Sequence, residues 1–186
     1  MNVYDFDKTI YDGDSTADFY IYSLKKHKKI ILFTPSLICA FIRFYVFKRG
    51  TKTMFKEKMY RFLEYCDIEN DVTEFWDKHQ HKIKKFYLEQ QKSDDVIISA
   101  SPEFLLQPIC KKLTINNLIA SRVDCKSGKY NGINCHGKEK VRRFYENFAN
   151  ETINEFYSDS YSDTPLAEIA DKAFIIKKNK IIEWKF

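Results

Sequence analysis

Apolar residues in the first half of the chain recur with the spacing of α-helices. The clearest case is residues 53–66, where the apolar positions follow the order i, i+4, i+7, i+8, i+11 and share one helix face. These positions are Phe55, Met59, Phe62, Leu63 and Cys66. Comparable patterns predict three further helical segments, over about residues 16–29, 35–49 and 71–91. Residues 14–91 are therefore expected to form an all-helical unit.

Residues that favour helix termini mark where three of these segments begin. Asp14 or Ser15 can cap the first segment. Thr34, which is followed by a proline, reads as the N-cap of the second. Asp71 with Glu74 three residues later resembles a capping box, which predicts that the last segment starts there.

The rest of the chain alternates between short apolar runs and amphipathic segments. The apolar runs predict strands near residues 2–4, 95–99, 117–125, 153–158, 172–176 and 180–184. Between them, helices are predicted over about 102–113 and 138–149, with a short one from Thr164. Such alternation predicts an α/β fold with a mostly parallel sheet. Its parts are residues 1–13 and 92–186.

Two carboxylates follow the first predicted strand. Asp5 and Asp7 are two residues apart, and residues at that spacing on an extended chain point to the same side. Like charges in one pocket repel each other, so the pair calls for a cation or a shared proton. Oxygen ligands suit Mg²⁺. Taken alone, the pair would better fit an acidic loop after an edge strand, because carboxylates cluster on loops; the rest of the sequence favours a site.

Hydroxyl, amine and further acidic groups follow other predicted strands. Ser99 ends the second apolar run, Lys138 and Lys140 open an amphipathic segment, and Asp159 and Asp163 follow the strand near residue 158. In open α/β sheets, ligands bind at the carboxyl ends of the strands. The sequence therefore predicts a site where these groups meet.

The order and types of these residues resemble the haloacid dehalogenase-like (HAD) superfamily, and most of all its phosphoserine phosphatase-like branch. The resemblance covers the whole chain. It implies a Rossmann-like α/β core of residues 1–13 and 92–186, with residues 14–91 as an all-helical cap inserted after the first strand. It also implies a Mg²⁺-dependent phosphomonoesterase that acts on a small phosphorylated metabolite through an aspartyl-phosphate.

The resemblance assigns roles to the acidic residues. Asp5 would be the nucleophile and a Mg²⁺ ligand. Asp7 would be the general acid and then the base, and its backbone carbonyl would also bind the metal. Asp159 would supply the other carboxylate ligand, and Asp163 would orient the ligands directly or through water.

Phosphate binding is assigned to Ser99, Lys140 and Thr9. Residues 135–141 match the family pattern Cys-x-Gly-x-x-Lys-Val with Lys140 at the position of its lysine, which favours this residue over Lys138. Ser101 is explained as the N-cap of the following helix.

Two positions depart from the family pattern. Lys8 stands where the family often carries a small residue, and it adds a positive charge near the pocket. Asp14 stands nine residues after the nucleophile, where phosphoserine phosphatases typically have a Glu that binds the substrate amine. Asp14 is therefore a candidate substrate contact, and the natural substrate stays open.

Composition narrows the possible partners. The formal charge of +5 is diffuse, which is compatible with an anionic substrate and does not indicate nucleic acid. Five cysteines without a Cys-x-x-Cys indicate neither a disulfide framework nor a zinc site. Asp5 and Asp7 fall where the apolar core of a signal peptide would lie, so we expect a cytoplasmic protein. The sequence leaves the oligomeric state open.

Residues 30–47 are apolar at 14 of 18 positions. The helix that starts at Pro35 spans roughly 21 Å before Lys48, against about 30 Å of hydrocarbon, and a single crossing would separate Asp5 from Lys140. We therefore expect a buried cap helix. The alternative is a cap surface that contacts anionic lipid, with a lipid-phosphate phosphatase of the phosphatidylglycerophosphatase type as the matching function. A non-catalytic HAD-like binding module is a third possibility.

Overall fold

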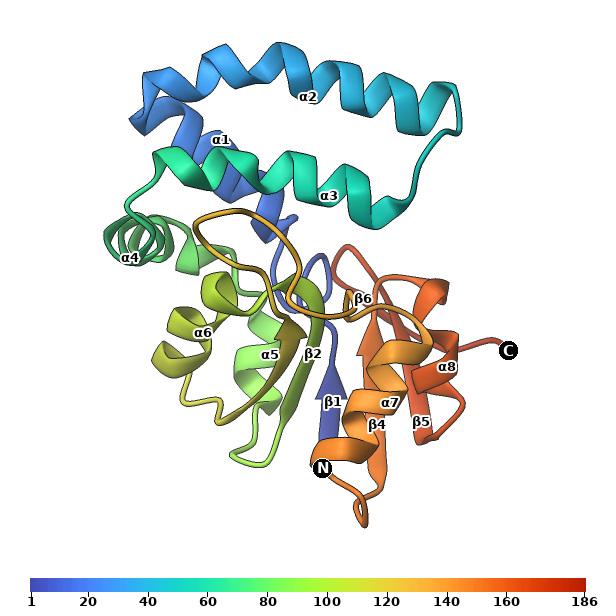
Figure 1. Cartoon of the computed structure of the whole chain (residues 1–186). Helices are drawn as coiled ribbons and strands as arrows, with labels where there is room; N and C mark the ends of the chain where they lie inside the picture. The colour runs from blue at the N-terminus through green and yellow to red at the C-terminus, as the bar shows by residue number, and fades with distance from the viewer.

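One mostly parallel sheet forms the centre of the molecule (Figure 1). The computed structural model describes residues 1–186, the side chain of residue 52 excepted. The strand order is β3-β2-β1-β4-β5-β6, and only the pairing of β5 with β6 is antiparallel among the described strands. The strands are β1 (Asn2–Tyr4), β2 (Val96–Pro102), β3 (Asn117–Ser121), β4 (Ile153–Ser158), β5 (Ala170–Lys177) and β6 (Lys180–Glu183). The predicted fold class is confirmed.

Helices cover both faces of this sheet, which explains why consecutive residues of its inner strands, such as Val3 and Tyr4, are apolar. Successive residues of a strand point to opposite faces, so Val3 and Tyr4 belong to two different core clusters. Helices α7 (Lys138–Asn147) and α8 (Thr164–Ala167) pack on the Val3 side. On the Tyr4 side lie α5 (Lys85–Gln90) and α6 (Glu103–Lys112).

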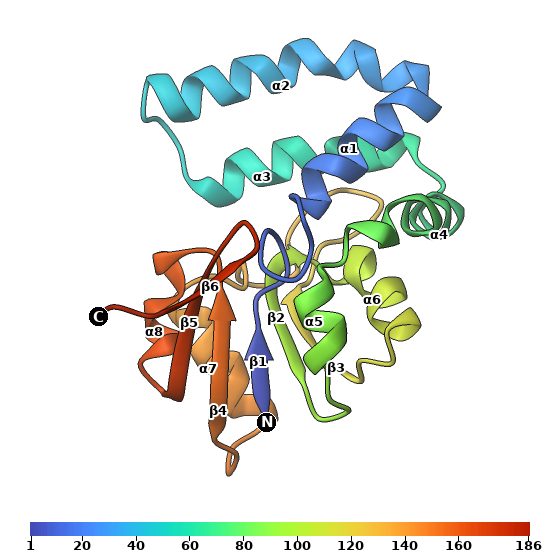
Figure 2. The ribbon, with the colours of Figure 1, turned by 180° about the vertical axis from the view of Figure 1, so that it is seen from behind.

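The first helices of the chain form a separate layer beyond the carboxyl ends of the strands (Figures 1 and 2). This layer contains α1 (Ser15–Lys26), α2 (Thr34–Phe41) and α3 (Lys52–Tyr60). A 3₁₀ turn at Lys28–Phe33 precedes α2, a π turn at Ile42–Val46 extends it, and a 3₁₀ turn at Arg61–Tyr65 follows α3. Asp14 caps α1, because its carboxylate accepts a hydrogen bond from the backbone N–H of Ala17 at 3.0 Å.

The long helix predicted over residues 71–91 is two helices in the structure. The first, α4 (Ile68–His79), starts before the predicted capping box, with Asp67 as its N-cap. Instead of starting the helix, Asp71 lies within its first turns, and its carboxylate accepts a hydrogen bond from the backbone N–H of Asp67 at 3.0 Å. After a 3₁₀ turn at Gln80–Lys82, the chain is extended at Lys84. There the backbone N–H of Lys84 donates to the carbonyl of Ile10 at 2.7 Å. This contact interrupts the single long helix that the sequence predicted.

Helices α4 and α5 pack against the core. The indole N–H of Trp76 in α4 donates to the carbonyl of Leu105 in α6 at 2.6 Å. The ring of Tyr87 in α5 lies edge-to-face on Tyr4 of β1, with centroids 4.9 Å apart. We therefore propose that the cap proper ends near residue 65 and that α4 and α5 belong to the core layer.

The apolar segment that contains α2 is not the buried cap helix that the sequence predicted. Ile30 and Ala40 are buried, but Leu32 is 80% exposed, and Val46 and Phe47 are each 64% exposed. The cap is one layer thick, and α1 and α3 contact only the inner side of this segment (Figures 1 and 2). By length and composition alone, Lys28–Val46 could cross a membrane, with a mean hydropathy of 1.6.

Candidate active site

A cavity of about 330 Å³ opens between the cap and the carboxyl ends of the strands. The core supplies its polar wall, which includes Asp5, Asp7, Ser101, Lys140, Asp159 and Asp163. The cap supplies mostly apolar side chains, among them Tyr45, Phe55, Met59 and Tyr60. The structure thus brings the predicted acidic residues and the predicted lysine together at one edge of the sheet.

Lys140 lies between two carboxylates at the centre of the site. Its Nζ donates to Oδ1 of Asp5 at 2.7 Å and to Oδ2 of Asp163 at 2.7 Å. Ser158 at the end of β4 donates its hydroxyl to the same oxygen of Asp163 at 2.9 Å. Gly137 precedes α7 with φ of +59°, a conformation that favours glycine. This turn starts α7 so that its first turn directs Lys140 into the site.

Burial and neighbouring charges shift the pKa values of these groups. Burial raises the pKa of Asp5 to about 7, and Lys140 opposes that rise. Burial also raises the pKa of Asp7 to about 6, and the carboxylate of Asp14 adds to it. For Lys140, burial acts to lower the pKa, but Asp5 and Asp163 outweigh it and raise the pKa above its ordinary value. The lysine therefore stays charged at neutral pH.

Asp7 is held by the start of the cap and by β2. The backbone N–H of Ser15, the first residue of α1, donates to Oδ1 of Asp7 at 2.6 Å. The hydroxyl of Ser101 donates to its other carboxylate oxygen. Lys8 next to it has φ of 57°, and its backbone N–H bonds to the carbonyl of Gly13 at 2.8 Å. This closed turn fixes Asp7 at the cavity wall.

The two serines of β2 occupy positions other than those that the sequence predicted. Among the described residues, Ser101 lines the cavity and Ser99 does not. The hydroxyl of Ser99 is buried and accepts the backbone N–H of Ser101 at 3.1 Å. Ser101 is not the N-cap of α6, because that position falls on Pro102. Strand β2 runs three residues further than predicted and shifts register between Ile98 and Pro102, which brings Ser101 to the cavity wall.

Three other predicted residues have distinct positions. Thr9 is fully buried, and its Oγ1 has no hydrogen-bond partner in the described part of the chain. It is absent from the cavity wall as described. Asp14 lines the cavity, but its carboxylate also caps α1. Asp159 lines the cavity, and burial raises the pKa of its carboxyl group.

The donor set at this edge consists of oxygen atoms. Asp5, Asp7 and Asp159 line one cavity wall, and burial raises the pKa of each. A nearby cation would relieve this cost of burying carboxylates. Hard, small cations such as Mg²⁺ prefer carboxylate and carbonyl oxygens. The residues present therefore fit a Mg²⁺ site.

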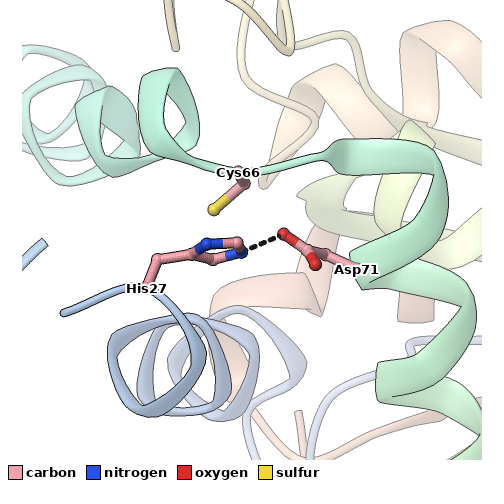
Figure 3. A group of neighbouring side chains, drawn as sticks. All are labelled: His27, Cys66 and Asp71. Carbon is pink, nitrogen blue, oxygen red and sulfur yellow. Dashed lines mark hydrogen bonds and ion pairs between the residues drawn. The ribbon is translucent and has the colours of Figure 1, made fainter. Parts of the chain in front are cut away.

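The structure also assembles a group that the sequence did not reveal, formed by His27, Cys66 and Asp71 (Figure 3). The fully buried carboxylate of Asp71 lies 2.6 Å from Nε2 of His27 and 2.8 Å from Nζ of Lys26. Burial raises the pKa of Cys66 to about 11, whereas metal binding needs a thiolate. The lysine already neutralises the carboxylate, so this group reads as an ion pair that joins the end of α1 to the start of α4.

The fold and site define an α/β enzyme whose paired aspartates and buried lysine lie beneath a helical cap. The chain matches the model of the haloacid dehalogenase-like hydrolases over residues 3–168 and belongs to this family. Protein CicA of Caulobacter vibrioides is 27% identical to it, over 91% of this chain and 82% of that protein.

Solved structures show the same fold. A Bordetella pertussis Tohama I protein of unknown function gives a TM-score of 0.73 at 18% identity, over 93% of this chain and 87% of that one. A phosphoserine phosphohydrolase-like protein of Francisella tularensis gives 0.57 at 16% identity, over 96% and 90%. The predicted family is confirmed, and the fold is shared with a phosphoserine phosphohydrolase-like protein.

Proposed function

We propose that the protein is a Mg²⁺-dependent phosphomonoesterase that forms an aspartyl-phosphate on Asp5. The observation that carries this proposal is the contact of Asp5 with the buried Lys140, at a cavity that Asp7 also lines. A carboxylate nucleophile and a phosphate ester are both anionic, so attack requires fixed positive charge nearby. The side chains of Asp5 and Asp159, with the backbone carbonyl of Asp7, would hold Mg²⁺, which supplies further positive charge when bound.

The residues then divide the reaction into two steps. The carboxylate of Asp5 attacks phosphorus, the bond from phosphorus to the leaving oxygen breaks, and protonated Asp7 gives that oxygen its proton. Asp7, now a carboxylate, takes a proton from water, whose oxygen attacks the phosphoryl group and releases phosphate from Asp5. The raised pKa of Asp7, about 6, suits a group that must both give and take a proton near neutral pH.

Hydrolysis of p-nitrophenyl phosphate tests this function directly. We expect turnover that stops when EDTA removes divalent metal and returns when Mg²⁺ is added in excess. Failure of the purified full chain to hydrolyse this ester and a panel of phosphorylated metabolites would contradict the proposal and favour a non-catalytic binding module.

Asp7→Asn is expected to lower turnover of alkyl phosphates by roughly 10²–10⁴-fold, because the proton carrier is lost while the nucleophile remains. The loss should be smaller for p-nitrophenyl phosphate, whose leaving group needs no proton. In that case phosphorylated protein should accumulate and be seen by mass spectrometry after acid quenching. Normal hydrolysis of alkyl esters by the variant would exclude Asp7 as the general acid.

Ser101→Ala is expected to raise KM and lower kcat/KM by about tenfold, because we propose that its hydroxyl donates to a phosphoryl oxygen once substrate displaces the bond to Asp7. The matched control is Ser99→Ala, two residues earlier in the same strand and outside the described cavity wall. Its kcat/KM should stay within about twofold of the original. The reverse ranking in steady-state kinetics would restore Ser99 as the phosphate-binding hydroxyl.

A lipid phosphate is the second candidate substrate, and the apolar side of the cavity favours it. Tyr45 and Phe55 line the cavity opposite the carboxylates, and Tyr45 is also 45% exposed at the cap surface. An ester with an apolar tail could place its phosphate at Asp5 and its tail along these rings. Comparing kcat/KM for phosphoserine with that for a short-chain phosphatidylglycerophosphate separates the two candidates.

A further inference from the structure

The segment Lys28–Val46 carries an exposed apolar face on the outside of the cap. Figures 1 and 2 both show this segment at the outermost edge of the molecule, with α1 and α3 on its inner side. We call the exposed residues on its outer side the outer apolar face. They are Ile31, Leu32, Ile38, Ile42, Val46 and the adjoining Phe47. Ile38, Ile42 and Val46 recur every four residues, and Ile31 lies seven residues before Ile38, which places these four along one side of a helix.

The inner side of the same segment is used for packing within the cap. The ring of Phe44 stacks on that of Phe55 in α3 with centroids 5.5 Å apart, and Phe41 lies 6.1 Å from the same ring. Tyr45 reaches the cavity that holds Asp5. Leaving the cap to span a bilayer would break these contacts, so the segment can meet a membrane only along its outer side.

The charged residues within and next to this segment of the chain are all basic. Residues 19–56 contain nine Lys and Arg and no Asp or Glu, whereas the remainder of the chain has 22 basic and 26 acidic residues. Exposed Lys28 and Lys29 stand at one end of the segment, and exposed Lys48 and Arg49 follow its other end. Lys26 is already paired with Asp71 and Glu74.

We propose that the outer apolar face docks on the surface of a bilayer that contains anionic lipid, with the segment lying in the plane of the headgroups. An apolar stripe with basic residues at both ends is complementary to acyl chains and anionic headgroups together. A second copy of the chain would instead bring two sets of positive charges face to face. Docking does not depend on the chemistry proposed for the cavity.

Co-sedimentation of the full chain with phosphatidylcholine vesicles, with and without phosphatidylglycerol, tests this surface. We expect partition onto the anionic vesicles that weakens as salt is added. Lys28→Gln with Lys29→Gln should lower the partition coefficient roughly fivefold for each lysine. Leu32→Ser and Phe47→Ser should each lower it about tenfold through lost apolar burial. All variants should keep the original melting temperature and the same hydrolysis of p-nitrophenyl phosphate.

Matched controls lie on other surfaces of the molecule. Ile133→Ser removes an equally exposed apolar side chain, and Lys177→Gln with Lys180→Gln removes two exposed charges from the β5–β6 hairpin. These variants should bind vesicles like the original protein. Absence of binding to anionic vesicles at low salt, or equal loss in controls and test variants, would overturn the proposal. A dimer by light scattering that Leu32→Ser dissociates would assign the face to a second copy instead.

Discussion

Asp5→Asn is expected to lower kcat for p-nitrophenyl phosphate by roughly 10⁴–10⁶-fold. The amide keeps the shape of the side chain but is neutral and cannot form an acyl-phosphate bond to phosphorus. Lys140 would lose one of its two carboxylate partners and keep Asp163 at 2.7 Å. The fold should therefore stay intact, and steady-state kinetics in excess Mg²⁺ measures the loss.

The control for this variant is Asp12→Asn, which changes an exposed acid in the same loop. It should leave kcat within about twofold of the original, while both variants unfold cooperatively. Loss of activity in Asp5→Asn together with loss of folding would be uninformative about chemistry, so circular dichroism accompanies the kinetics. Retention of more than about a tenth of the original kcat by folded Asp5→Asn would exclude Asp5 as the nucleophile.

Lys140→Met is expected to affect both stability and activity. It leaves the carboxylates of Asp5 and Asp163 buried without their shared cation, and breaking such a buried pair costs about 3–5 kcal/mol of unfolding free energy. Turnover should fall by about 10²–10³-fold, because a fixed positive charge near the phosphoryl group is lost. Chemical denaturation and steady-state kinetics measure the two effects on the same preparation.

Two further variants separate the structural role of Lys140 from its chemical role. Adding Asp163→Asn to Lys140→Met removes one unpaired carboxylate, so it should restore part of the stability and none of the turnover. Lys138→Met changes an exposed lysine two residues away and should alter stability by no more than about 0.5 kcal/mol. A larger loss of turnover in Lys138→Met than in Lys140→Met would reverse the assignment of the lysine.

Patterns within the sequence were sufficient to predict the sheet and the place of the site. Val3 and Tyr4 are both apolar because helices cover both faces of β1. Parallel strands place their carboxyl ends at one edge, so residues that follow strands, such as Asp5 and Asp159, meet there. Lys140 joins them because a short turn after Gly137 starts α7 at the same edge. Local pattern and strand direction together determine this much.

The choice between two serines needed the tertiary structure. Ser99 and Ser101 have the same side chain and follow the same apolar run. Pairing with β3 extends β2 to Pro102, and the register shift before it decides which hydroxyl reaches the cavity. Likewise, the bond from Lys84 to the carbonyl of Ile10 ends a helix that local periodicity would have continued. Both outcomes depend on contacts between segments far apart in the chain.

Composition and period are local properties, so they suffice to predict that residues 30–47 form an apolar helical segment with basic ends. The exposure of its outer side depends on the packing of distant helices and is seen only in the folded chain. Whether an apolar face is covered depends on how many layers pack around it, and here α1 and α3 contact the inner side alone. The ion pair of Lys26 with Asp71 has the same origin, since residues 45 positions apart meet only when α1 and α4 pack together.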